Sequence, residues 1–174
     1  DTKLATSMKD QLIVWDLETG SQETVLSHAG SLHNIAYSPD GRWLASASSE
    51  GNIYLWDTEN HYALAQTSLQ MNGQPFALAF SPDGKYLAAG SSNYFVYLWD
   101  LTLGQEVTRI PHSDVVTGVE FSPDGTELVT AARKVIQIWD FMSLPVIQKE
   151  SLVETACSRL VANMSQSEWD NFYA

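Results

Sequence analysis

Several residues of this chain have the types that catalysis needs, and their spacing decides whether they can act together. His112, Ser113 and Asp114 are the residue types of a hydrolytic triad, but they are consecutive, whereas the members of a triad converge from separate parts of a fold. Gly84 and Lys85 lack the earlier glycine and the following Ser or Thr of a phosphate-binding loop. We therefore interpret His112 as a structural loop residue and predict no catalytic residues.

Metal and thiol chemistry also find no support in the spacing. Zinc sites place their ligands at short, regular separations. No such separation joins the four histidines and the one cysteine: His28, His33, His61, His112 and Cys157. Three aspartates recur, but each stands in the same turn sequence and is therefore structural: Asp40, Asp83 and Asp124. We interpret Cys157 as a small buried residue on a helix face and predict neither a metal nor a cofactor.

The charge balance indicates which partners the chain repels. Its 9 Lys and Arg residues against 21 Asp and Glu residues give a net charge of −12. This charge disfavours the phosphates of nucleic acid and the anionic surface of a membrane. We expect a protein or peptide partner of basic or neutral character. A single cysteine forms no intrachain disulfide, which fits a reducing compartment, so we expect a cytoplasmic protein.

Two short sequence motifs recur along the chain in a fixed phase. Trp-Asp occurs four times at intervals of 41, 43 and 40 residues, beginning at Trp15, Trp56, Trp99 and Trp139. Ser-Pro-Asp-Gly occurs three times, and its serine precedes the next of these tryptophans by 18, 18 and 17 residues. Recurrence of this kind indicates a repeat architecture.

The segments between these motifs have the hydrophobic patterns of β-strands. Spaced apolar residues precede each Ser-Pro-Asp-Gly, whose Pro, Asp and Gly favour a tight turn. A short strand, a second tight connection and an apolar strand ending in the tryptophan follow. Because that last strand is apolar on both faces, we expect it to be covered on both sides. More polar outer strands are expected at residues 22–26, 62–66, 106–110 and 146–149.

With these motifs, the sequence resembles the WD-repeat (WD40) family over roughly residues 1–150. The resemblance implies an all-β propeller built from four-stranded blades. Counting strands predicts three complete blades and a partial first one, because no innermost strand precedes Leu4. Propellers close with about four to eight blades. We therefore interpret the chain as the C-terminal portion of a larger propeller, or as a half that completes itself with a second copy.

The family resemblance also implies a buried hydrogen-bond chain from a turn acid to a loop His, a strand Ser or Thr, and the Trp indole. One blade has all four residue types at matching positions: His28, Ser46, Glu50 and Trp56. The first and last blades offer a partial set: Thr6, Asp10 and Trp15, then His112, Thr130 and Trp139, with Arg133 or Lys134 where the acid belongs. The blade of Trp99 has Met71, Ala89 and Asn93 there, so we expect it to rely on apolar packing.

Two departures from the repeat mark a candidate partner-binding rim. The stretch from Trp56 to Ser81 is 25 residues, against 23 in two other units, and the extra pair lies within residues 67–74. Tyr94 takes the turn position that Gly51 holds one unit earlier, and Tyr is enriched in binding hot spots. The predicted rim, with its methionine exposed, consists of Met71, Gln74, Asn93 and Tyr94. The alternative is drift within a degenerate blade.

After Lys149 the pattern changes to helical spacing. Capping boxes at residues 151–154 and 165–168 predict two short helices, so residues 151–174 are assigned to a helical tail. With its Ala156-Cys157, Arg159-Leu160, Asn163 and Glu168-Trp169, the tail is similar to the end of many bacterial WD-repeat chains that carry STAND-type nucleotidase, caspase-like or kinase modules upstream. This resemblance implies a larger signalling protein.

Together these features predict a non-enzymatic interaction or sensor propeller at the C-terminal end of a bacterial signalling protein. Two other functions stay open: recruiting substrate for a catalytic domain upstream, or holding a larger ring closed. The partner of these blades is accordingly a protein or peptide, further blades of the same parent chain, or a second copy.

Overall fold

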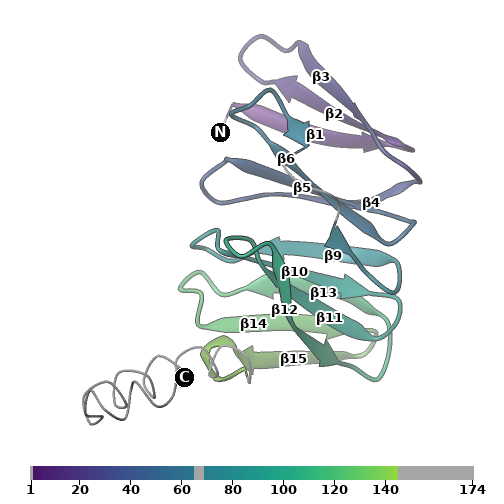
Figure 1. Ribbon diagram of the computed structural model, residues 1–174, viewed down its shortest axis with the longest axis vertical. Coiled ribbons are helices and arrows are strands. Elements are labelled where there is room, and N and C mark those ends of the chain that lie inside the picture. Colours follow the sequence, from purple (N-terminus) through teal and green to yellow (C-terminus); the bar gives the residue numbers. More distant parts are fainter. Residues whose placement is uncertain (1, 65–68, 145–174) are drawn as a thin grey trace, which may run out of the picture. The chain divides into compact units, whose positions relative to one another are not determined.

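The computed structural model describes residues 2–64 and 69–144, which form four antiparallel sheets in chain order (Figure 1). The first sheet contains three strands: β1 (Lys3–Met8), β2 (Gln11–Asp16) and β3 (Gln22–Ser27). The second contains β4 (Leu32–Tyr37), β5 (Trp43–Ser48) and β6 (Asn52–Asp57), with two short outer segments, β7 (Ala63–Leu64) and β8 (Leu69–Gln70), both paired with β6.

The third sheet has four strands: β9 (Pro75–Phe80), β10 (Tyr86–Ser91), β11 (Phe95–Asp100) and β12 (Gln105–Pro111). The fourth has three described strands: β13 (Val116–Phe121), β14 (Glu127–Ala132) and β15 (Val135–Asp140). A 3-10 turn, η1 (Phe141–Ser143), follows, and the carboxylate of its N-cap residue Asp140 accepts the N–H of Ser143 at 3.3 Å. The expected all-β architecture with antiparallel sheets is therefore present.

A shared register aligns the tryptophan strands. Each of the first three sheets places its Trp opposite a leucine of the neighbouring strand: Leu4 with Trp15, Leu44 with Trp56, and Leu87 with Trp99. In the first and third sheets a bulge directly before the Trp shifts the pairing with the outer strand. The repeat in sequence is thus a repeat in cross-strand pairing, which places equivalent side chains on equivalent faces.

The three Ser-Pro-Asp-Gly turns use one set of hydrogen bonds. In each, the glycine N–H donates to the serine carbonyl at 2.8–2.9 Å, and the glycine φ is +70° to +75°. The serine hydroxyl donates to the Asp carboxylate at 2.5–2.6 Å and accepts the N–H of the next strand's first residue at 2.8–2.9 Å. Glycine adopts this left-handed conformation without the steric cost that a Cβ brings. The recurring aspartates therefore fix turns, as the sequence predicts.

Neighbouring sheets pack through unlike faces. Leu12 and Val14 of β2 share a buried cluster with Leu44 and Trp56 of the second sheet. One sheet further along the chain, Ile53 and Leu55 of β6 share another with the aromatic pair Tyr97 and Trp99. The innermost strands β4, β9 and β13 contact one another in the same order. An aliphatic face of one sheet is thus covered by the tryptophan face of the next.

The matching aliphatic face of β15 is open. Ile136 and Ile138 stand three and one residues before Trp139, and they are 72% and 64% exposed. Val96 and Leu98 hold the same two positions in β11 and are fully buried. The pattern of the sequence is therefore the same in both strands, while only one of them has its cover within the described residues.

Several predictions concern residues outside the described ranges. The fourth outer strand expected at residues 146–149 and both helices of the tail lie there. Of the outer strand expected at residues 62–66, the structure describes only β7 (Ala63–Leu64). The described residues before Asp140 belong to one compact unit, Asp1–Trp139, while the domain boundary at residue 150 remains a prediction.

Candidate functional site

The predicted hydrogen-bond chain of the second sheet has three members. The indole N–H of Trp56 donates to Ser46 Oγ at 2.7 Å, and this oxygen lies 2.7 Å from Nε2 of His28. All three side chains are buried. Because β5 carries Ser46, β6 carries Trp56 and the loop after β3 carries His28, the chain ties two strands to the loop that enters the sheet.

Glu50, predicted as the acid end of this chain, does not take part in it. Its residue is exposed, while Nδ1 of His28 is buried and has no hydrogen-bond partner among the described residues. The Glu50 side chain lies across Gly30 instead, where an added Cβ would come within 2.9 Å of its Cγ. Burial lowers the pKa of His28 to about 4, so the ring stays neutral near physiological pH.

The fourth sheet has the same kind of hydrogen-bond chain, with a different partner for the histidine Nδ1. Nε2 of His112 lies 2.7 Å from Thr130 Oγ1, which accepts the indole N–H of Trp139 at 3.0 Å. Here Nδ1 of the histidine has a partner, the Ile110 carbonyl at 3.1 Å. Arg133, which stands where the acid belongs, instead pairs its Nε with Asp114 Oδ2 at 3.3 Å. The turn is thus linked to the loop by an ion pair rather than through the histidine.

In the first sheet only the tryptophan and its strand partner are joined. The Trp15 indole donates to Thr6 Oγ1 at 2.9 Å. Asp10 is exposed and contributes through its backbone, because its carbonyl accepts the N–H of His28 at 2.8 Å. The expected acid is therefore present at this turn without being part of a buried chain.

The third sheet relies on aromatic packing, with a separate polar link at the turn. Tyr97 stacks on Trp99 with 5.7 Å between ring centroids, in a cluster that includes Ala89 and Met71. The Asn93 side-chain amide donates to the Tyr97 hydroxyl at 2.7 Å and to the Asn72 carbonyl. This asparagine therefore connects the turn to the preceding loop without a histidine.

Of the four residues of the predicted rim, Gln74, Asn93 and Tyr94 lie close together, while Met71 faces inward. Met71 is only 8% exposed, because it fills the apolar space beside Ala89 and Tyr97 where other blades place their histidine. Its N–H donates to the Gly51 carbonyl at 2.9 Å, which fixes the loop in that position. A flexible thioether suits such a gap. The expectation that Met71 is exposed is therefore wrong.

The other members of the rim lie close together at the surface. Tyr94 is 48% exposed, and its φ of 70° is in the left-handed region. Its carbonyl accepts the N–H of His112 at 2.7 Å. Gln74 is exposed and donates its N–H to Ser92 Oγ at 2.9 Å, while Asn93 bonds the adjacent loop. These bonds hold an aromatic side chain at a defined place on the rim.

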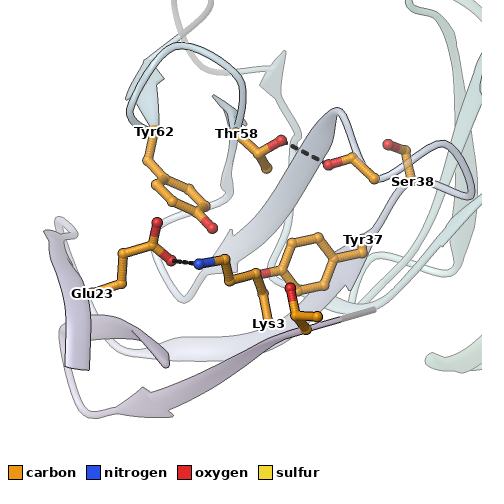
Figure 2. Close-up of a pocket in the computed structure, with 8 residues that line it drawn as sticks. Lys3, Glu23, Tyr37, Ser38, Thr58 and Tyr62 are labelled. Atoms are coloured by element: carbon orange, nitrogen blue, oxygen red, sulfur yellow. Dashed lines mark hydrogen bonds and ion pairs between the residues drawn. The ribbon is translucent and has the colours of Figure 1, made fainter. Parts of the chain in front are cut away.

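A pocket of about 420 Å³ lies at the other ends of the strands, between the first and second sheets (Figure 2). It is lined by Thr2, Lys3, Glu23, Tyr37, Ser38, Gly41, Thr58 and Tyr62. Lys3 Nζ lies 2.8 Å from Asp16 Oδ2 and 2.9 Å from Glu23 Oε2. The hydrogen bond to Asp16, followed by the one to Glu23, raises the pKa of Lys3. The Tyr37 hydroxyl is buried and has no hydrogen-bond partner among the described residues.

Sequence reasoning missed this pocket because its residues come from five separate segments. One signal was available: β1 and β2 pair Lys3 directly with Asp16, and opposite charges facing each other across strands attract. The tyrosines carried no comparable signal, since Tyr37 precedes a turn and Tyr62 stands in the segment after β6.

Across residues 2–64 and 69–144 no group of three or more His, Cys, Asp or Glu side chains could hold a metal ion. No helix in the same ranges has the length and apolar character to cross a bilayer.

Comparison with known proteins identifies the repeat. A family model for the WD domain, G-beta repeat, matches residues 20–57, 67–100 and 104–140. A WD repeat-containing protein of Schistosoma mansoni, SL1-17, is 35% identical over 78% of this chain and 46% of its own length. An uncharacterized WD repeat-containing protein of Synechocystis, sll1491, is 33% identical over 72% of this chain and 36% of its own length.

A third relative is matched over a shorter stretch. The target of rapamycin complex subunit wat1 of Schizosaccharomyces pombe is 33% identical over 31% of this chain and 18% of its own length. The chain thus spans less than half the length of each of these relatives.

The matched repeats are offset from the sheets by one strand. The segment 20–57 contains β3, which pairs in the first sheet, and β4 to β6, which form the second. The segment 104–140 likewise joins β12 of the third sheet to β13, β14 and β15 of the fourth. Each sequence repeat therefore connects two sheets.

We predict that replacing Trp56 by Phe destabilises the chain more than replacing Trp99 by Phe. Trp56→Phe leaves Ser46 without the donor that it accepts from, which costs about 1–3 kcal/mol beyond the lost ring area. The Trp99 indole makes no hydrogen bond to a described residue, so Trp99→Phe loses packing alone. Denaturant unfolding measures both changes, and equal losses would contradict the contribution of the hydrogen-bond chain.

His28 is expected to make stability depend on pH. Its folded-state pKa of about 4 lies below the ordinary value of 6.5, so the unfolded chain binds the proton more readily. The contribution is complete above pH 6.5 and is lost as the pH falls toward about 4, by up to about 3 kcal/mol. Unfolding of wild type and His28→Gln between pH 7 and about 4 tests this. Parallel pH profiles would contradict a buried neutral ring.

Proposed function

We propose that this chain, which belongs to the WD40 repeat family, is a non-enzymatic platform that binds a protein or peptide through the rim carrying Tyr94. The observation that carries the proposal is the half-exposed aromatic ring at a turn whose backbone is fixed on both sides. Tyr supplies a large contact area with few rotatable bonds, so a rigid exposed Tyr loses little entropy on binding. Gln74 and Asn93 provide a polar border, as at many hot spots.

The wider setting belongs to the same proposal. We place the chain at the C-terminal end of a larger bacterial signalling protein in the cytoplasm, where the blades act as sensor or recruiting module. The tail resemblance and the partial coverage of the relatives support this setting. By its name, wat1 is a subunit of a complex, which is the type of role proposed here. If a catalytic domain precedes these residues, the blades recruit its substrate.

The test of the rim uses Tyr94→Asn, because Asn tolerates the left-handed conformation while removing the ring. We expect recovery of partners by the natural full-length protein to fall at least about tenfold. Leu103→Ala is the matched control, since Leu103 is 56% exposed in the turn after β11, at the opposite end of the same sheet. Equal recovery by wild type and Tyr94→Asn, at unchanged melting temperature, would reject the rim and favour drift.

A second candidate function is blade-to-blade assembly, and the open face of β15 favours it. In the described sheets, an aliphatic face is covered by a tryptophan face of the next sheet. Ile136 and Ile138 have the composition of such a face, and no described residue covers them. We propose that this face receives a further blade, from the same parent protein or from a second copy, as part of a larger ring.

The 174-residue chain is therefore expected to self-associate with rising concentration and to bind a hydrophobic dye. A double variant, Ile136→Thr with Ile138→Thr, keeps β-branched strand residues and reduces both signals. Val25→Thr, at a position 38% exposed on β3, is the control. Light scattering after size exclusion measures the mass. A monodisperse wild-type monomer with low dye binding would contradict the proposal.

A further inference from the structure

The pocket between the first two sheets is a second feature that could meet a partner, separate from the Tyr94 rim. Lys3 begins β1, Glu23 lies on β3, Tyr37 ends β4 and Tyr62 follows β6. The antiparallel pairing of Leu32 with Ser48 puts the turn after β5 at the start of β4, so Tyr37 lies at the other end of the sheet. The pocket thus opens at the strand ends opposite to those that carry the loop–turn links.

Two of the five hydroxyl groups of the pocket lining, those of Ser38 and Thr58, are engaged in hydrogen bonds. Ser38 Oγ donates to Asp40 at 2.5 Å and accepts from the Trp43 N–H at 2.8 Å. Thr58 Oγ1 donates to the Gly41 carbonyl at 2.7 Å. The Tyr37 hydroxyl is buried and makes no hydrogen bond of ordinary geometry to a described residue, and the Tyr62 hydroxyl is its neighbour in the pocket. A buried hydroxyl in that state costs free energy that a bound polar group would recover.

The charge of the pocket selects the sign of that group. Lys3 of the lining is held between Glu23, also of the lining, and Asp16, which lies outside it, so these three charges sum to −1 and the single ammonium is already paired twice. The pKa of Tyr37 is raised by burial and by its neighbours Tyr62 and Glu23, which keeps the phenol neutral. An anion would meet an ammonium that two carboxylates already pair, whereas a cation would meet the Glu23 carboxylate, which binds Lys3 through Oε2, and the phenol oxygens of Tyr37 and Tyr62.

We propose that this pocket binds the side chain of an arginine in a protein or peptide partner. A guanidinium presents five N–H donors in one plane, and Figure 2 shows the Tyr62 and Glu23 side chains directed toward Lys3, with the Tyr37 ring beside the lysine. The tyrosine rings add cation–π attraction. The volume of about 420 Å³ admits the side chain together with part of the adjoining backbone. The inference rests on the proposed function as a binding platform and adds the residue type recognised.

The experiment titrates the 174-residue chain with a blocked Gly-Arg-Gly peptide. The tyrosine ring signals are followed by NMR and assigned with Tyr37→Phe and Tyr62→Phe. We expect saturable shifts of the Tyr37 and Tyr62 signals. Matched peptides replace the arginine by citrulline, which is neutral and of similar shape, by lysine, or by phosphoserine. The citrulline peptide should bind at least about tenfold more weakly, because it lacks the charge-assisted hydrogen bonds.

Two variants separate the pocket from the fold. Glu23→Gln removes the carboxylate charge and should weaken the arginine peptide about tenfold. Tyr37→Phe removes the unpartnered hydroxyl and should weaken it about threefold while leaving the melting temperature unchanged or higher. Glu120→Gln, an exposed acid on β13 outside the pocket lining, is the control for net charge.

The outcomes decide the proposal in both directions. Saturable binding that is weakened by Glu23→Gln and spared by Glu120→Gln supports it. Three results would overturn it. The first is no saturation up to about 20 mM peptide, which corresponds to a binding free energy weaker than about −2.3 kcal/mol. The others are equal binding of the citrulline or lysine peptide and a preference for the phosphoserine peptide. Because the probe is a free peptide, failure here leaves the Tyr94 recovery experiment unaffected, and failure of that experiment leaves this result standing.

Discussion

The unlike faces of each sheet are the constraint on which the other features depend. The third strand of a repeat must be apolar on both sides, because one side contributes aliphatic residues to a neighbour and the other contributes the tryptophan. A one-residue shift of register would exchange the two sides. The common pairing of Trp with Leu, the bulges beside the Trp and the identical Ser-Pro-Asp-Gly turns all prevent such a shift.

The polar chain is secondary to that packing. It is longest where His28 or His112 enters beside a Ser or Thr, and the third sheet dispenses with it by stacking Tyr97 on Trp99. The link between the loop and the turn persists in each of these sheets by different chemistry: a packed Glu50, an Asn93 amide or an Arg133 ion pair. What the repeat preserves is the connection between these two segments, and the side chains that make it vary.

Local sequence predicted the elements well and the side-chain contacts less well. Turns and third strands follow from residue type and alternation, so the strands around Trp56 and Trp99 lie where the Trp-Asp and Ser-Pro-Asp-Gly motifs predict them. The inward position of Met71 could not be predicted, because it depends on the space left by a missing histidine ring. Glu50 failed as a hydrogen-bond partner because its side chain packs beside Gly30 at the surface rather than reaching the buried Nδ1 of His28. The Lys3–Tyr37–Tyr62 pocket depends on how two sheets approach, which no local pattern encodes.

The one-strand offset between repeat and sheet has a consequence for how such chains grow. A duplicated segment like 20–57 contains one outer strand, which pairs with the sheet before it. Its other three strands form the next sheet, whose outer strand comes from the following segment. A new copy therefore cannot fold as an isolated module, and it interlocks with its neighbours as soon as it is ordered. In evolutionary terms the unit of copying differs from the unit of folding, so lengthening the gene by one repeat adds a blade whose hydrogen bonds are shared with chain that was already there.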